Sequence, residues 1–549
     1  METTANTSPP RKKSKKMMLG IGAAVIVVLA GLGTAYAKLD LFKSAKTIYL
    51  QAEATSMLQL SDDVSTAYSE YEEYMKPYLE QPVHSKTEIS DITLDADIPD
   101  PSAQAVVDLL KSAKLVVNSN MDEQKHQQSG NIELHLNDQP LTSVAFFQND
   151  TVFGFEFPDF YSKYLYMDLK DREALEAAYG EELPKRFVTT GDFYEALKFD
   201  NNELKSVLTP YALLYAESIQ DSQVTINKDA SFKEEGYETG AKEITVSFSQ
   251  EEASALLTQI AEKAKADETL LNLLYTRYTN LSTLMDDSGY PVEILSKEDF
   301  KQEYDQFFAD MIEEVKVGNE TKEQLKMVVL VNDDYQILSR KLYFTGEQGN
   351  EEQVLWNSVS FKNGADTYHR YSLHDPENAE DSEMTFTYKA TEQDGKTSGN
   401  VSFLFVDAAE PQLDLKTTFE TTKQDQKEDG TYSFTVSVLD ETIGEQVSLS
   451  GDITSSVTNT ENGRQSTADV SINFDQATPD MPKGLSLQLN ATEEFGKPLE
   501  IPTISADNSV NLATLTDQQM MEIEQEVGMA AQQFMMDNAQ LFEEFMMMP

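Results

Sequence analysis

"TYSFTVSVLD" (residues 431–440) decides the fold class of the larger part of this chain, because its polar and apolar residues alternate. Tyr432, Phe434, Val436 and Val438 fall on one face of an extended strand, and the polar residues between them fall on the other. A strand with one apolar and one polar face is typical of an antiparallel sheet that meets water on one side.

The alternation repeats on both sides of this stretch. "QLKMVVLVNDDYQILSRKLYF" (residues 324–344) predicts a hairpin that turns at Asn332–Asp334. Further strands are expected near residues 354–362, 366–373, 383–391, 398–407, 411–422, 431–439, 445–458 and 465–475. Strands this long and this numerous predict a large curved antiparallel sheet or a half-barrel. Residues 476–514, which contain four prolines, are expected to be a looser return segment.

The first half of the chain mixes helices with strands. Residues 44–80 predict a helix that ends near Pro77, and short alternating strands follow from residue 87 to residue 157. Ser249 with Glu252, and Ser296 with Asp299, have the spacing of capping boxes that open two further helices.

A C-terminal amphipathic helix is expected over residues 516–546. Thr516 and Gln519 match a capping box, and Phe534, Leu541 and Phe545 lie on its apolar face. Its polar face carries only acidic charges, which does not suit an anionic membrane surface. We therefore expect this helix to dock on the body of the protein or on a partner.

Residues Met17–Ala37 form an uncharged, largely apolar run behind five basic residues. The run is long enough for a transmembrane helix, and the basic flank predicts a cytoplasmic N-terminus. The prediction is a single-pass protein of the cell membrane, with an extracytoplasmic body. The alternative is secretion after cleavage at Ala37, because Ala35-Tyr36-Ala37 matches a signal-peptide cleavage pattern.

Charge and cysteine content restrict the chemistry. The chain of 549 residues contains 95 acidic and 43 basic side chains, for a net charge of -52. Such a body repels nucleic acid and attracts cations, basic ligands or basic protein partners. The chain has no cysteine, which excludes disulfides, thiolate metal sites and cysteine nucleophiles.

Catalytic and metal-binding motifs are missing from the sequence. There is no His-Glu-x-x-His and no Gly-x-Ser-x-Gly, and Gly395-Lys396-Thr397 is interpreted as a hairpin turn because Ala390 stands where a phosphate loop needs glycine. His369 and His374 have an odd spacing, so a strand would point them to opposite faces. The prediction is a protein that is not an enzyme and has no cofactor and no metal site.

Aromatic residues are enriched between residues 153 and 166. Phe153, Phe155 and Phe157 would share one strand face. Core packing and an apolar contact surface both explain this enrichment. The candidate contacts for an apolar ligand or a partner are Phe153, Phe155, Phe157, Tyr161, Tyr164, Phe534, Leu541 and Phe545.

"PDFYSKYLYMDLKDREAL" (Pro158–Leu175), together with "SAKTIYLQAEA" (residues 44–54), resembles single-pass surface proteins of Bacillus-type Gram-positive bacteria that carry a domain of unknown function. The residues that carry the resemblance are Pro158, Tyr161, Lys163, Tyr164 and Asp168. The resemblance implies an anchor, a helix and then strands, and it implies no activity. The order of strands and helices is also similar to half-barrel lipoprotein carriers of the LolA type, as a likeness of fold alone.

The sequence thus predicts an α+β protein with an N-terminal transmembrane helix, a large curved antiparallel β-sheet or half-barrel with packed helices, and a C-terminal amphipathic helix. The expected divisions are a basic tail (1–16), the transmembrane helix (17–37), a linker and helix (38–84), a mixed α+β domain (85–320), a mostly antiparallel β domain (321–514) and the C-terminal helix (515–549). The expected function is a membrane-anchored, extracytoplasmic, non-enzymatic binding or envelope-structural module. The alternative is a half-barrel carrier or sensor of an apolar ligand, either a lipid or a peptide.

Overall fold

The computed structural model describes residues 43–95, 107, 109–180, 182–199, 201–317, 324–345, 352–375, 382–407, 410–440, 445–474 and 482–539. Its strands are β1 (Val83–Asp95), β2 (Ala113–Asp122), β3 (Gln127–Leu136), β4 (Gln139–Gln148), β5 (Val152–Phe157), β6 (Tyr161–Asp168), β7 (Val224–Glu234), β8 (Tyr237–Ser249), β9 (Gln324–Val331), β10 (Ile337–Thr345), β11 (Glu352–Asn363), β12 (Asp366–His374), β13 (Glu383–Gln393), β14 (Lys396–Asp407), β15 (Glu410–Gln424), β16 (Lys427–Asp440), β17 (Glu445–Thr460), β18 (Gly463–Phe474), β19 (Gly484–Phe495) and β20 (Ser509–Asn511). Its α-helices are α2 (Ala45–Glu80), α4 (Arg172–Tyr179), α5 (Thr190–Leu197), α6 (Asn201–Ser218), α7 (Gln250–Ala266), α8 (Glu268–Asp287), α9 (Lys297–Val317) and α10 (Asp517–Asp537).

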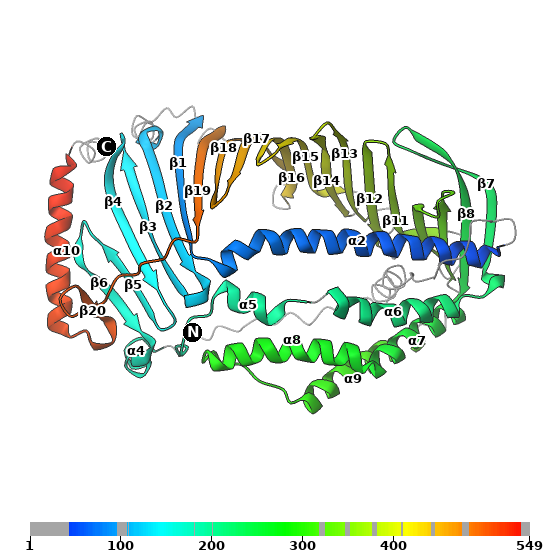
Figure 1. The fold of residues 1–549 in the computed structure, drawn as a ribbon, viewed down its shortest axis with the longest axis horizontal. Coiled ribbons are helices and arrows are strands. Elements are labelled where there is room, and N and C mark those ends of the chain that lie inside the picture. Colours follow the sequence, from blue (N-terminus) through cyan, green and yellow to red (C-terminus); the bar gives the residue numbers. More distant parts are fainter. Residues whose placement is uncertain are drawn as a thin grey trace.

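All the described strands belong to one 20-stranded sheet. From β7 to β19 each strand pairs with the next one in the chain, and β19 then pairs with β1, which begins the run to β6. These pairings are antiparallel, and the short β20 adds to β6 in parallel. The sheet runs along the longest axis of the molecule and has two open edges, at β7 and β20 (Figure 1).

Short turns connect the long strands and fix their register. Asp394-Gly395 joins β13 to β14, with φ values of 54° and 75°, and Glu235-Gly236 joins β7 to β8, with 48° and 81°. Two consecutive residues with positive φ are characteristic of the tight turn that matches the twist of a hairpin. The predicted hairpin at Asn332–Asp334 is confirmed between β9 and β10.

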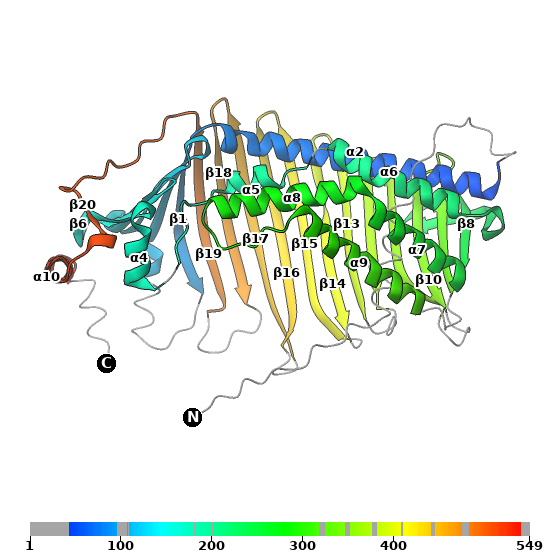
Figure 2. The same cartoon turned by 90° about the horizontal axis from the view of Figure 1, so that it is seen from below.

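Helices α2 and α5–α9 lie on one side of the sheet, and α10 lies at its β6 end (Figures 1 and 2). Ser44 caps α2 as its Oγ accepts a hydrogen bond from the Thr47 amide. The predicted helix over residues 44–80 is confirmed, and Pro77 lies inside its last turn. The predicted capping boxes at Ser249 and at Thr516 are present, with Glu252 and Gln519 as their third residues.

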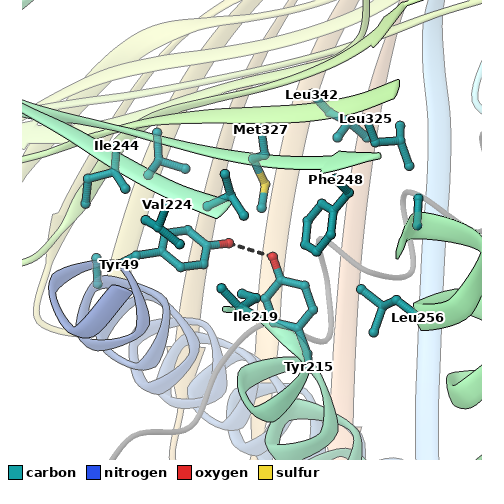
Figure 3. Close-up of a cluster of buried hydrophobic side chains, with 14 of the residues drawn as sticks. Tyr49, Tyr215, Ile219, Val224, Ile244, Phe248, Leu256, Leu325, Met327 and Leu342 are labelled. Atoms are coloured by element: carbon teal, nitrogen blue, oxygen red, sulfur yellow. Dashed lines mark hydrogen bonds between the residues drawn. The ribbon is translucent and has the colours of Figure 1, made fainter. Parts of the chain in front are cut away.

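The main core lies at the β8–β11 end of the sheet, under α2, α6 and α7. Tyr49 of α2 and Tyr215 of α6 are fully buried there, and their hydroxyls form a hydrogen bond of 2.7 Å (Figure 3). Val329 and Ile244 close the core from the sheet side. A second, smaller cluster around Phe232 packs the β7–β8 hairpin against β10–β12.

A buried ion pair ties α2 to the sheet. The Glu53 carboxylate pairs with the Arg340 guanidinium of β10, and their side chains are 2% and 11% exposed. Burial raises the pKa of the Glu53 carboxyl, and the positive charge of Arg340 opposes that shift. Removing one member of such a pair leaves an uncompensated buried charge.

The predicted fold class is wrong. In place of the predicted α+β protein with a large curved antiparallel sheet or half-barrel, the described residues form one open 20-stranded sheet that extends along the whole molecule, not around one cavity. The expected return segment 476–514 contains β19, the strand through which the two halves of the sheet pair. Among the helices of the described ranges, none is both long enough and apolar enough to cross a membrane, and Met17–Ala37 lies outside those ranges.

We predict that Arg340→Met lowers the free energy of unfolding by about 3–5 kcal/mol, because it leaves the Glu53 carboxylate buried without its ionic partner. The double variant Glu53→Met/Arg340→Met should lose less free energy of unfolding, since no charge remains buried without a partner. Denaturant unfolding curves measure both values.

The matched control is Lys416→Met, which breaks an exposed pair with Asp414 and should cost no more than about 1 kcal/mol. If the Arg340→Met variant is as stable as this control, the ion pair does not stabilise the packing of α2 on the sheet.

Candidate functional site

The strands from β13 to β19 place their apolar residues on one face. The register aligns these residues in rows across the sheet, one of which runs through Phe386, Phe403, Leu415, Val436 and Leu449. Since cross-strand partners point to the same side, each row belongs to a single face. We call this surface the apolar face; it consists of Met384, Phe386, Tyr388, Val401, Phe403, Phe405, Leu413, Leu415, Phe419, Tyr432, Phe434, Val436, Val438, Val447, Leu449, Ile453, Val470, Ile472, Phe474, Leu485, Leu487 and Leu489.

The opposite face of the same strands is polar. Its corresponding row runs through Ser402, Lys416, Thr435, Ser450 and Asn473. Hydroxyl, amide and charged side chains of this kind are well solvated, so this polar face needs no cover. The apolar face points the other way, to the side on which Arg340 meets α2 and Trp356 packs against the main core.

The apolar face has no core beneath it. In the part of the chain that the structure describes, none of its side chains is buried. Met384, Val438 and Val447 are 41%, 46% and 42% exposed, whereas Val329 in the main core is 0% exposed. Soluble proteins seldom leave a contiguous apolar surface of this kind to water, and such surfaces usually mark binding sites.

Helix α2 spans this face and is attached at its two ends. Its first turns are buried in the main core through Ile48, Tyr49 and Ala52. In its middle, the Leu58 and Tyr71 side chains are 57% and 49% exposed. The helix therefore crosses the strands of the sheet (Figure 1), and Leu58 and Tyr71 are among its side chains that stay exposed.

The second attachment of α2 lies at the β18–β19 end. The Tyr78 ring packs edge-on against Phe495 at a centroid distance of 5.4 Å, and its hydroxyl donates a 2.8 Å hydrogen bond to the Glu493 carboxylate. Burial and this carboxylate raise the pKa of Tyr78. The Arg464 guanidinium lies 4.7 Å from the centre of the Tyr74 ring.

The helices beside the apolar face are acidic. The exposed acids of the second half of α2 are Glu70, Glu72, Glu73 and Glu80, accompanied by Lys76. Helix α9 exposes Glu298, Asp299, Glu303, Asp310 and Glu313. Together with the net charge of -52, these residues surround the face with a negative potential.

The structure divides the predicted contact residues into groups. Phe153, Phe155 and Phe157 follow one another along β5, with ring centroids 6.3 and 5.6 Å apart. Phe155 pairs with Phe146 of β4, and these strands belong to the far end of the same sheet. Tyr164 of β6 instead packs against the buried Phe147, at 5.4 Å.

The remaining predicted contacts concern α10. Phe534 packs against Phe160 with centroids 5.1 Å apart, so the helix docks at the β6 end of the sheet (Figure 1). Tyr161 is buried nearby, and burial together with Glu526 and Glu522 raises the pKa of its hydroxyl. Leu541 and Phe545 lie outside the described residues.

Sequence reasoning did not nominate the apolar face as a site. The alternation of each strand is visible in the sequence, but it predicts a buried core face equally well. Among the described residues, no group of three or more metal-ligating side chains comes together.

The chain matches no protein-family model and no curated protein sequence. Similar solved structures include a loop-deletion mutant of OmpT, an outer membrane protein of Vibrio cholerae, at 8% identity, 76% of this chain, 98% of that chain and a TM-score of 0.20. OccAB4 of Acinetobacter baumannii matches at 7% identity, with 76% and 98% coverage and a TM-score of 0.23. OccK10 of Pseudomonas aeruginosa matches at 6% identity, with 76% and 99% coverage and a TM-score of 0.22. At these scores the likeness carries no argument about function.

The predicted function and location are corrected on the structure of the described residues. No helix in those ranges could span a membrane, and the sheet that their strands form is open at β7 and β20. The membrane-anchored extracytoplasmic module, its alternative as a half-barrel carrier of an apolar ligand, and the single-pass location with its secreted alternative are therefore not retained. The carrier interpretation fails for a physical reason. The sheet is open, with edges at β7 and β20, and does not wrap around one ligand cavity.

If the apolar face is exposed to water, a hydroxyl group placed on it should lower the free energy of unfolding only slightly. We predict that Val447→Thr changes the free energy of unfolding by no more than about 0.5 kcal/mol. Val329→Thr makes the same chemical change in the main core and should cost about 1–3 kcal/mol, because the new hydroxyl is buried. Equal losses in denaturant unfolding would show that the apolar face is part of a core.

Proposed function

We propose that the apolar face binds a positively charged, amphipathic segment of a partner protein. The observation that carries the proposal is the contiguous row of half-exposed apolar side chains on β13–β19, beneath helix α2, whose own Leu58 and Tyr71 side chains are exposed. A partner segment that covered this row would remove the apolar side chains from water, which favours binding.

Apolar contact alone would allow several kinds of binding partner, and the charge of the surrounding helices discriminates among them. The exposed acids of α2 and α9 favour a segment that carries lysine or arginine beside its apolar stripe. A second copy of this chain would bring another net charge of -52 to the same place, so self-association is disfavoured. Anionic lipid headgroups would be repelled for the same reason.

The shape of the face favours an elongated segment. The apolar residues form a band that crosses strand after strand, and α2 shows that a helix can lie along this direction (Figure 2). An amphipathic helix presents an apolar stripe at every third or fourth residue, with charges on its other side. Such a helix would contact the band and the acidic helices together.

The proposal predicts that the purified protein binds a synthetic amphipathic helix of leucine and lysine, and binds a leucine–glutamate analogue at least about tenfold more weakly. Fluorescence anisotropy of labelled peptides measures both affinities. The affinity for the lysine peptide should fall as salt rises, because ions screen the exposed acids.

Variants localise the peptide. Met384→Gln combined with Val438→Asn should weaken binding of the lysine peptide at least about tenfold. The control Thr435→Asn changes the polar face and should leave the affinity unchanged. Equal binding of both peptides, or displacement of the lysine peptide by vesicles of neutral phosphatidylcholine, would overturn the proposal and point to hydrocarbon chains as the occupant.

A further inference from the structure

A cavity of about 730 Å³ lies between the first half of α2 and strands β10–β12. Its volume is within the range of sites that bind small molecules. Glu53, Arg340, Trp356, Ser358, His369 and Tyr371 are among its lining residues. The cavity adjoins the β12 end of the apolar face, but its walls are of a different chemical kind.

One wall is a set of aromatic rings. The rings of Trp356 and Tyr371 have centroids 6.0 Å apart, and the imidazole of His369 is stacked on Tyr371 at 6.4 Å, with an angle of 8° between planes. Trp356 and Tyr371 are adjacent across β11 and β12 on the side that faces α2. Flat ring faces in a cavity bind other flat or weakly polar surfaces.

Part of the remaining lining consists of hydroxyl and amide groups, and Met57, Ile337 and Leu338 add apolar surface. Ser358, Ser360 and Gln59 contribute such groups, and Ser360 Oγ lies 2.9 Å from His369 Nδ1. These groups both donate and accept hydrogen bonds, so they suit a ligand rich in hydroxyls.

We propose that this cavity binds a saccharide. The carbon–hydrogen faces of pyranose rings stack on aromatic side chains, while the sugar hydroxyls meet the serine and amide groups. Two cationic residues, Arg340 and Lys362, line the cavity. A phosphate or nucleotide is nevertheless a poorer match, because Arg340 is already paired with Glu53, Lys362 is exposed to water, and the protein carries a net charge of -52. The inference does not depend on the partner proposed for the apolar face.

The experiment uses a property of the sequence. Trp356 is the only tryptophan in the chain, so its fluorescence reports on this cavity alone. The full chain is titrated with cellotetraose, maltotetraose and tetra-N-acetylchitotetraose. At least one should give a saturable change in tryptophan emission, with a dissociation constant of about 1 mM or tighter, and should raise the melting temperature.

Ser358→Tyr fills the cavity and should weaken that response at least about tenfold. Tyr371→Leu removes a stacking face at a half-exposed position and provides a second variant if Ser358→Tyr does not fold. The control Thr418→Tyr adds the same ring to the polar face and should bind as the unaltered chain does. The absence of a response to all three saccharides, a response that survives in both cavity variants, or saturable binding of inorganic phosphate or ATP instead would overturn the proposal.

Discussion

The two-residue period of the β-strand, kept in register from β13 to β19, is the constraint on which the rest of this structure depends. Each strand alternates polar and apolar residues, and each pairing aligns like with like, as in Phe386–Phe403 and Thr387–Ser402. A slip of one residue in any pairing would move apolar side chains to the solvated face. The tight turns, such as Asp394-Gly395, prevent that slip at the strand ends. One mainly apolar face and one mainly polar face follow from this constraint.

The helices cover the apolar side of the sheet at one end and leave it exposed further along. The covered part is the main core, and the exposed part is the candidate binding site. At the β8–β11 end, α2, α6 and α7 bury it, with the Tyr49–Tyr215 hydrogen bond and the Glu53–Arg340 ion pair inside. Beyond β12 the same alternation continues, yet no side chain of the apolar face is buried among the described residues. Helix α2 joins the two regions, because it is fixed in the core at one end and at Tyr78 at the other. The cavity at Trp356 lies where the covered part of the sheet gives way to the uncovered part.

Local patterns in the sequence revealed the elements but not the long-range contacts. Alternation identified the strand of Tyr432–Val438, and cap spacing located the helix starts at Ser249 and Thr516, because both signals are local. The pairing of β19 with β1 joins segments about four hundred residues apart, and no local signal encodes it. The prolines that flank β19 made residues 476–514 look like a loop. Glu53 and Arg340 were two charges among many, and only the fold brings them together. The anchor expected at Met17–Ala37 lies outside the described residues, and no alternation in a strand could have distinguished a covered apolar face from an open one.

The absence of cysteine from the chain allows the most direct test of the open face. Single substitutions Val438→Cys, Thr435→Cys and Val329→Cys place one thiol on the apolar face, on the polar face and in the main core, respectively. The measured quantity is the rate of maleimide labelling of each folded, purified protein. The account predicts that Val438→Cys reacts about as fast as Thr435→Cys and far faster than Val329→Cys, and that a bound partner protects only the Val438→Cys thiol. Labelling of Val438→Cys as slow as that of Val329→Cys, in the protein without a partner, would contradict the account.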